Sequence, residues 1–156
     1  MSDAEPPTAD AEARSSPPAN QAALHWLSIA LGDLRAAELI LEGDLPLRTA
    51  AGHAQQAAEK ALKGALALDG RDPPRIHDLA ALALAVGLDF RDSLEHIDLD
   101  GLTEGGAAGR YPGLDDEPYV LSEAEALVGD ARMIIERVTA VIREHGVALV
   151  DDLPPR

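Results

Sequence analysis

The chain has 156 residues, which suits one domain that buries a hydrophobic core without staples, and it lacks the cysteine needed for disulfides, thiolate metal ligands or a cysteine nucleophile. Asp and Glu number 28 against 13 Lys and Arg, and this net charge of −15 opposes the attraction of a polyanion. No stretch resembles a signal peptide or a membrane span. We therefore expect a cytoplasmic protein with no membrane or DNA partner.

The N-terminal part consists of a tail followed by a first helix. Residues 1–19 are rich in Pro, Ser, Ala and acidic residues and lack large apolar side chains, so we expect a disordered tail. Asn20 is predicted to cap a helix that runs to about Glu42, because leucines recur there with helical spacing. Gly43 ends this helix.

The second helix is predicted for residues 49–68. Its buried row consists of small side chains that let a neighbouring helix approach closely: Ala54, Ala58, Ala61, Ala65 and Leu68. His53, Gln56, Lys60 and Lys63 share a polar face, on which Glu59 precedes Lys63 by four residues in the favourable ion-pair order. This face is either solvated or a surface for a partner.

The remaining chain contains a short helix from about His77 to Val86 and a long final helix. Between them, residues 88–121 predict one or two helical turns, with Gly105 and Gly106 as breakers. A capping box from Ser122 to Glu125 begins the final helix. The pattern predicts an all-α, up-and-down four-helix bundle with one short extra helix over residues 20–146, followed by a C-terminal tail over 147–156.

Three segments carry a resemblance to a known family. Residues 48–68, the sequence Ile76-His77-Asp78-Leu79 after a Pro-Pro turn, and Arg110-Tyr111-Pro112 resemble the prokaryotic HEPN domain, the helical partner of minimal nucleotidyltransferases. The resemblance extends over roughly residues 20–145. It implies a HEPN-like bundle that forms a homodimer through its small-residue helix faces.

The resemblance also implies a candidate catalytic motif. In HEPN ribonucleases an Arg precedes a His by a short spacing, the Arg binding phosphate and the His serving as acid/base for attack by the RNA 2′-hydroxyl. Three pairs fit this spacing, from Arg48 to His53, from Arg71 to His77 and from Arg91 to His96, and we take Arg91 and His96 as the candidate catalytic pair. Active members carry the motif at the start of the final helix, where this chain has Arg110 without a following His.

The densest basic stretch defines a candidate nucleotide or anion site. It comprises Lys60, Lys63, Arg71, Arg75 and His77, with backbone N–H groups at a helix start close by. The alternative is structural: Asp78 caps the third helix and His77 only packs at its start. Arg110 is either a further cationic ligand of the anion site or a buried charge paired with Glu59 or Asp78.

The residues expected at a structural or partner face are Gln56, Glu59, Asp78 and Tyr111. The five histidines (His25, His53, His77, His96 and His145) show no ligand spacing, so we predict neither a metal nor another cofactor. The leading hypothesis is a dimeric binding partner of a minimal nucleotidyltransferase in a toxin–antitoxin type pair, with a nucleotide or RNA site. The alternatives are a metal-independent ribonuclease toxin and a purely structural interaction module.

Overall fold

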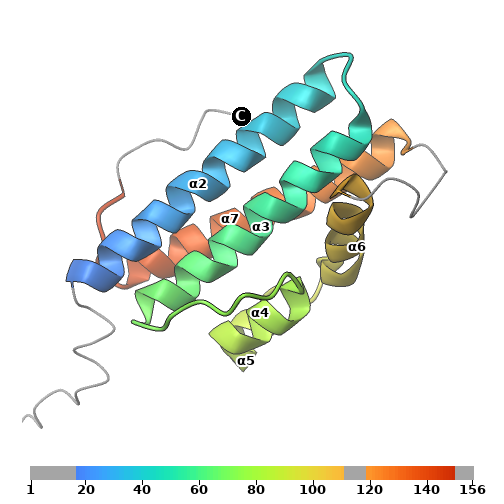
Figure 1. The fold of residues 1–156 in the computed structure, drawn as a ribbon. Helices are drawn as coiled ribbons and strands as arrows, with labels where there is room; N and C mark the ends of the chain where they lie inside the picture. Colours follow the sequence, from blue (N-terminus) through green and yellow to red (C-terminus); the bar gives the residue numbers. More distant parts are fainter. Residues whose placement is uncertain (1–16, 111–118, 150–156) are drawn as a thin grey trace, which may run out of the picture.

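Three long helices form the main body of the protein. The computed structural model describes residues 17–110 and 119–149, and within these ranges it contains helices and no strand. The long helices are α2 (Pro17–Glu42), α3 (Leu47–Leu68) and α7 (Leu121–Glu144), with α3 in contact with both others (Figure 1). The predicted all-α fold is confirmed.

Three short helices cover the side of α3 that faces away from α2 (Figure 1). They are α4 (Leu79–Val86), α5 (Leu88–Asp92) and α6 (Leu99–Arg110). Helices α4 and α6 pack on α3, whereas α5 packs on α4. As a result α3 is enclosed by α2, α7, α4 and α6, and it contributes a large part of the core.

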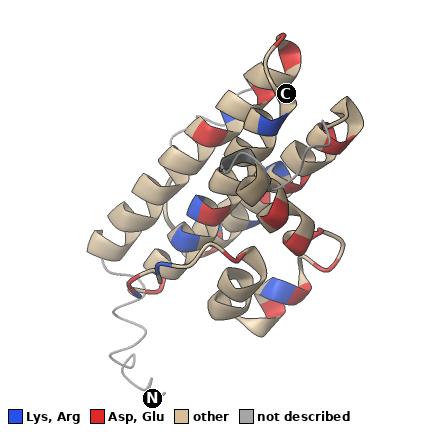
Figure 2. Cartoon of the chain, turned by 45° about the vertical axis from the view of Figure 1, so that its right-hand side comes forward, with Lys and Arg blue, Asp and Glu red and all other residues tan. Residues whose placement is uncertain are grey.

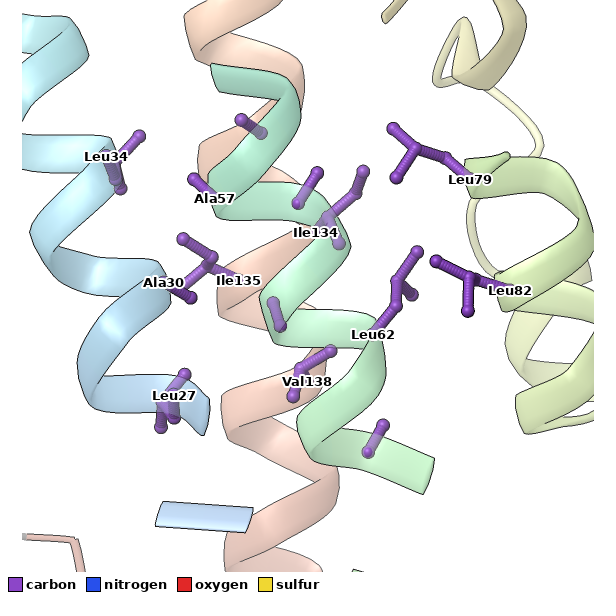
Figure 3. Packing of buried hydrophobic residues seen from close by; sticks show 14 of the residues in the cluster. Leu27, Ala30, Leu34, Ala57, Leu62, Leu79, Leu82, Ile134, Ile135 and Val138 are labelled. Carbon is purple, nitrogen blue, oxygen red and sulfur yellow. The ribbon is translucent and has the colours of Figure 1, made fainter. Parts of the chain in front are cut away.

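The alanine row of α3 lies inside the chain. Ala54, Ala58 and Ala61 are fully buried, as are Leu62 on α3 and Ile134 on α7. Figure 3 shows Leu27, Ala30 and Leu34 of α2 on one side of α3 and Leu79 and Leu82 of α4 on the other. Small side chains let these helices approach closely, as predicted. The alanines are covered by the chain's own helices, so they cannot also be the expected surface of a homodimer.

The Gly105–Gly106 pair lies inside α6, which corrects its prediction as a helix breaker. Glycine is required there by packing. A Cβ at Gly106 would approach Cβ and Cγ of Gln55 on α3 to well under 3.0 Å, and one at Gly105 would lie 2.9 Å from Cδ1 of Leu127 on α7. The two glycines therefore allow α6 to sit close to α3 and α7, and the buried contact outweighs the weak helix propensity of glycine.

Two predicted helix starts are wrong. Helix α2 already includes Pro17, the first described residue, so Asn20 lies within the helix and is not its cap. Helix α7 begins at Leu121, before Ser122, and the backbone N–H of Val120 donates to the carboxylate of Glu123 at 3.3 Å. Glu123 is the third residue of the helix, and its carboxylate already accepts the free N–H at the helix start. The hydroxyl of Ser122 is therefore not needed as a cap.

The short helix α4 is fixed by polar bonds at both ends. Asp78 caps its N-terminus by accepting a hydrogen bond from the backbone N–H of Ala81 at 2.9 Å, and the Leu79 N–H donates to the Thr103 hydroxyl of α6 at 3.2 Å. At the other end, the Arg71 guanidinium donates to the carbonyl of Ala85 at 2.6 Å. Among the described residues, no helix is long and apolar enough to cross a membrane.

Candidate functional site

A buried carboxylate on α3 is the centre of the polar network. Glu59 is 4% exposed, and its oxygens accept hydrogen bonds from Lys63 Nζ at 2.7 Å and Gln55 Nε2 at 2.8 Å. Nδ1 of His77, in the loop before α4, lies 3.0 Å from the same carboxylate. Residues of one helix face and of a separate loop thus meet at Glu59, and the predicted Glu59–Lys63 ion pair is present.

The network keeps Glu59 ionised. Burial disfavours the charged carboxylate and raises its pKa, but the hydrogen bonds from Lys63, His77 and Gln55 lower it, and the net result is a pKa below the usual value. Lys63 also lies over the Trp26 ring of α2, with Nζ 5.9 Å from the ring centroid. The polar face predicted for α3 is therefore largely covered by neighbouring groups rather than solvated.

A second carboxylate binds the outer part of the same face. Asp33 on α2 forms a short ion pair with Lys60 of α3, and its other oxygen lies 3.0 Å from His53 Nδ1. Gln56, between them on α3, donates to the Gln55 side-chain oxygen at 2.8 Å. Each lysine of the predicted anion site is consequently neutralised by a carboxylate of its own chain.

Of the two loop arginines, only Arg75 is available to a ligand. The guanidinium of Arg71 donates to Ala85 and pairs with Asp69 at 3.2 Å, so it stabilises the carbonyl end of α4. Arg75 is exposed and has no hydrogen-bond or ion-pair partner among the described residues. Four of the five basic residues of the predicted site already bind acceptors of the protein.

A surface pocket of about 440 Å³ lies beside this end of the bundle, between the start of α2 and the end of α3. Trp26 and Ala22 form part of its wall, and Arg71 and Asp72 are its charged lining residues. Because Arg71 is bound to α4 and Asp69, the pocket offers apolar surface rather than an unpaired cation for a phosphate.

Arg91 and His96 stand apart from the Glu59 network. Arg91 is exposed in α5 and pairs with Asp92 at 3.7 Å, and His96 is exposed in the turn that leads to α6. His96 is near Asp130 of α7, whose pKa is raised by burial and by the charge of Asp98, against the lowering effects of a hydrogen bond from the Asp98 backbone and of His96. The structure shows no contact that joins Arg91 to His96.

The Arg110-Tyr111-Pro112 segment contributes nothing to the described geometry. Arg110 is the last residue of α6, and its side chain lies outside the described part of the structure, as does Tyr111. Their predicted roles, as an anion ligand, an ion-pair partner or a partner contact, therefore stay predictions.

The sequence analysis missed the roles of three residues. Gln55 is fully buried and donates both to Glu59 and, at 3.3 Å, to the His77 carbonyl, so it ties α3 to the loop before α4. Its position four residues before Glu59 was a usable signal. Asp33 and Gly106 gave no such signal, because their partners are 27 and 51 residues away in the sequence.

The arrangement can orient one imidazole for proton transfer. The His77 side chain is 65% exposed, and Glu59 holds it through Nδ1, which leaves Nε2 free to exchange a proton with a bound molecule. A carboxylate hydrogen-bonded to one ring nitrogen fixes the orientation and the tautomer of a neutral histidine. Within the described residues no group of three or more His, Asp or Glu side chains could hold a metal ion.

Comparison with known proteins agrees with this fold of helices around a central α3. The family model described as the HEPN domain matches residues 23–142, which span α2 through nearly all of α7. The chain therefore belongs to the HEPN domain family. No curated protein and no solved structure matches it.

Proposed function

We propose that this HEPN-domain chain is a cytoplasmic binding protein that forms a homodimer and acts with a minimal nucleotidyltransferase in a toxin–antitoxin pair. Membership of the HEPN family supports this class of function. The charge of −15 favours a protein partner with a basic surface over a long polyanion. A nucleotide bound between the two proteins is compatible with this role. Arg75 is the cation we assign to it, because Arg75 is exposed and has no partner among the described residues.

The observation that carries the proposal is the internal pairing of the basic residues. Lys60 binds Asp33, Lys63 and His77 bind Glu59, and Arg71 binds the end of α4. Binding RNA through these side chains would require breaking the existing contacts. Surface complementarity with a partner protein requires no such rearrangement.

The proposal requires a minimal nucleotidyltransferase encoded near this chain, and co-purification with that protein tests it. Light scattering should give twice the monomer mass of 16.4 kDa for the chain alone and a larger, stoichiometric complex when the nucleotidyltransferase is added. A monomer that forms no complex with the nucleotidyltransferase at micromolar concentrations would refute the proposal.

The second candidate function is metal-independent RNA cleavage, and the Glu59–His77 contact specifically favours it. In this role the Nε2 of His77 would take the proton of the attacking 2′-hydroxyl, while Glu59 would stabilise the protonated ring. Arg75, two residues before His77, would contact the phosphate. This pair differs from Arg91 and His96, because His96 has Asp130 nearby but no carboxylate hydrogen-bonded to its ring among the described residues.

An RNA digestion in the presence of a chelator separates these candidates. If the chain cleaves RNA through the Glu59–His77 pair, His77→Ala abolishes cleavage and His96→Ala does not; the reverse result would assign the activity to Arg91 and His96. His25→Ala is the matched control, because His25 is also exposed but belongs to neither pair. Under the leading proposal none of these proteins cleaves RNA.

A further inference from the structure

An apolar ridge crosses the outer side of α4 and the start of α5. Helix α4 contains only alanine, leucine and valine, yet only one of its sides packs on the bundle. Leu79 and Leu82 point toward Leu62 and Ile134 (Figure 3), whereas Leu84 is 53% exposed and Leu88 is 68% exposed. We call Ala81, Leu84 and Leu88 the α4–α5 ridge.

The ridge is held rigidly by the rest of the fold. Asp78 and Arg71 bind the two ends of α4, and Phe90 anchors α5 in the core. Gly87, between the two helices, has φ 155° and ψ 158°, a conformation that residues with a Cβ rarely adopt. This backbone places Leu88 directly after α4 instead of continuing the helix. A helix that is apolar all round is normally buried, so a rigid, exposed apolar side indicates a missing partner.

The charges around the ridge define the chemistry of that partner. From Asp78 to Asp100 the chain has six acidic residues and one basic residue, Arg91, which pairs with Asp92. Two cations from outside this segment are also close, but Arg71 is bound to the end of α4 and Arg137 to Ser93. All six acidic residues are exposed, and Figure 2 shows acidic positions along α5 and the turn toward α6. An apolar centre with an acidic rim complements an apolar surface flanked by Lys and Arg.

We propose that the α4–α5 ridge is the docking site for an amphipathic helix of a partner protein, with leucine-like side chains on one face and Lys or Arg on its flanks. The inference rests on the proposed function, because it assigns the surface through which the partner is bound. A second copy of this chain would bring two acidic rims together, and RNA would meet the same negative charge. The partner helix instead buries Leu84 and Leu88 while its cations meet Asp89 and Glu95.

Paired leucine variants test the ridge. In Leu84→Gln/Leu88→Gln the full-length chain should bind the nucleotidyltransferase at least about tenfold more weakly, because two apolar contacts are lost. The matched control is Leu39→Gln/Leu45→Gln, which alters two leucines of similar exposure, 49% and 57%, on α2 and the following turn. The control should bind like the wild type, and circular dichroism verifies that both variants are folded.

A synthetic amphipathic helix with leucines on one face and lysines on its flanks serves as an independent probe. It should bind the wild type, bind Leu84→Gln/Leu88→Gln at least about tenfold more weakly, and weaken as salt rises. The same peptide with glutamates in place of lysines should not bind. Asp89→Asn/Glu95→Gln should also weaken binding of the lysine peptide, whereas Asp44→Asn/Glu125→Gln should not, since the latter removes two charges elsewhere.

The outcomes separate this inference from the proposed function. A complex with the nucleotidyltransferase that survives Leu84→Gln/Leu88→Gln overturns the docking site and leaves the proposed function standing. If the wild type forms no complex with the nucleotidyltransferase, the proposed function fails, and ridge-dependent binding of the lysine peptide then supports the docking site alone. Equal peptide binding by both leucine variants, or a homodimer that only Leu84→Gln/Leu88→Gln dissociates, overturns the docking site.

Discussion

Substitution of Gly106 by alanine tests how α6 is attached to α3. The added methyl group would overlap Cβ of Gln55, and no rotation of the Gln55 side chain can move that atom. Helix α6 must therefore shift, and the buried hydrogen bonds of Gln55 to Glu59 and to the His77 carbonyl are disturbed with it. The substitution consequently tests both the packing of the glycine pair and its link to the Glu59 network.

The expected net effect is a loss of about 3 kcal/mol of unfolding free energy. Overpacking of a close contact costs about 2 kcal/mol, and weakening two buried hydrogen bonds costs about 1 kcal/mol each. Replacing glycine by alanine within a helix returns about 1 kcal/mol. Steric overlap thus outweighs helix propensity at this position.

Urea denaturation followed by circular dichroism measures the effect, and two other glycines provide controls. Gly129 of α7 has no atom within 4 Å of an added Cβ, so Gly129→Ala should stabilise the protein by about 1 kcal/mol. Gly105→Ala should fall between the two, since its main obstacle is the flexible end of Leu127. If Gly106→Ala proves as stable as Gly129→Ala, the close packing of α6 on α3 is refuted.

The remaining predictions concern charged groups. Glu59→Gln should cost about 3 kcal/mol at pH 7, because it leaves Lys63 without its counter-charge. Since the pKa of Glu59 is lower in the folded protein, its contribution is present above the ordinary glutamate pKa and is lost as pH falls through the lowered pKa, so urea midpoints of the variant and wild type should converge in acid. Asp130→Asn should stabilise the protein at pH 7 and lose that advantage toward pH 3, because the raised pKa of Asp130 makes its ionised form unfavourable in the fold; a destabilised variant at pH 7 contradicts this. Arg71→Ala should lower the melting temperature by several degrees by releasing the end of α4, whereas Arg75→Ala should leave it unchanged, and equal effects would contradict the assigned role of Arg71.

Much of the helical framework was readable from local patterns. The alanine row of α3, the apolar stripe of α7 and the Glu59–Lys63 spacing each depend on residues within a few turns of one helix. Local sequence predicted only one or two helical turns there and did not reveal the length of α6, because its glycines are explained only by the neighbouring Gln55 and Leu127. It also assigned the helix caps to Asn20 and Ser122, although Asn20 lies inside α2 and Glu123 bonds the first turn of α7.

The candidate site divides in the same way. The sequence by itself determined that Lys60, Lys63, Arg71, Arg75 and His77 form the densest basic stretch, because they follow each other closely along one helix and the next loop. Only the tertiary structure decided that Asp33 of α2 neutralises Lys60, that Glu59 holds His77, and that Arg71 supports α4. The physical reason is that ion pairing depends on distances between side chains from different elements, and helix packing sets those distances. For the same reason the exposure of Leu84 and Leu88 became visible only when one side of α4 was seen packed on the bundle and the other left uncovered.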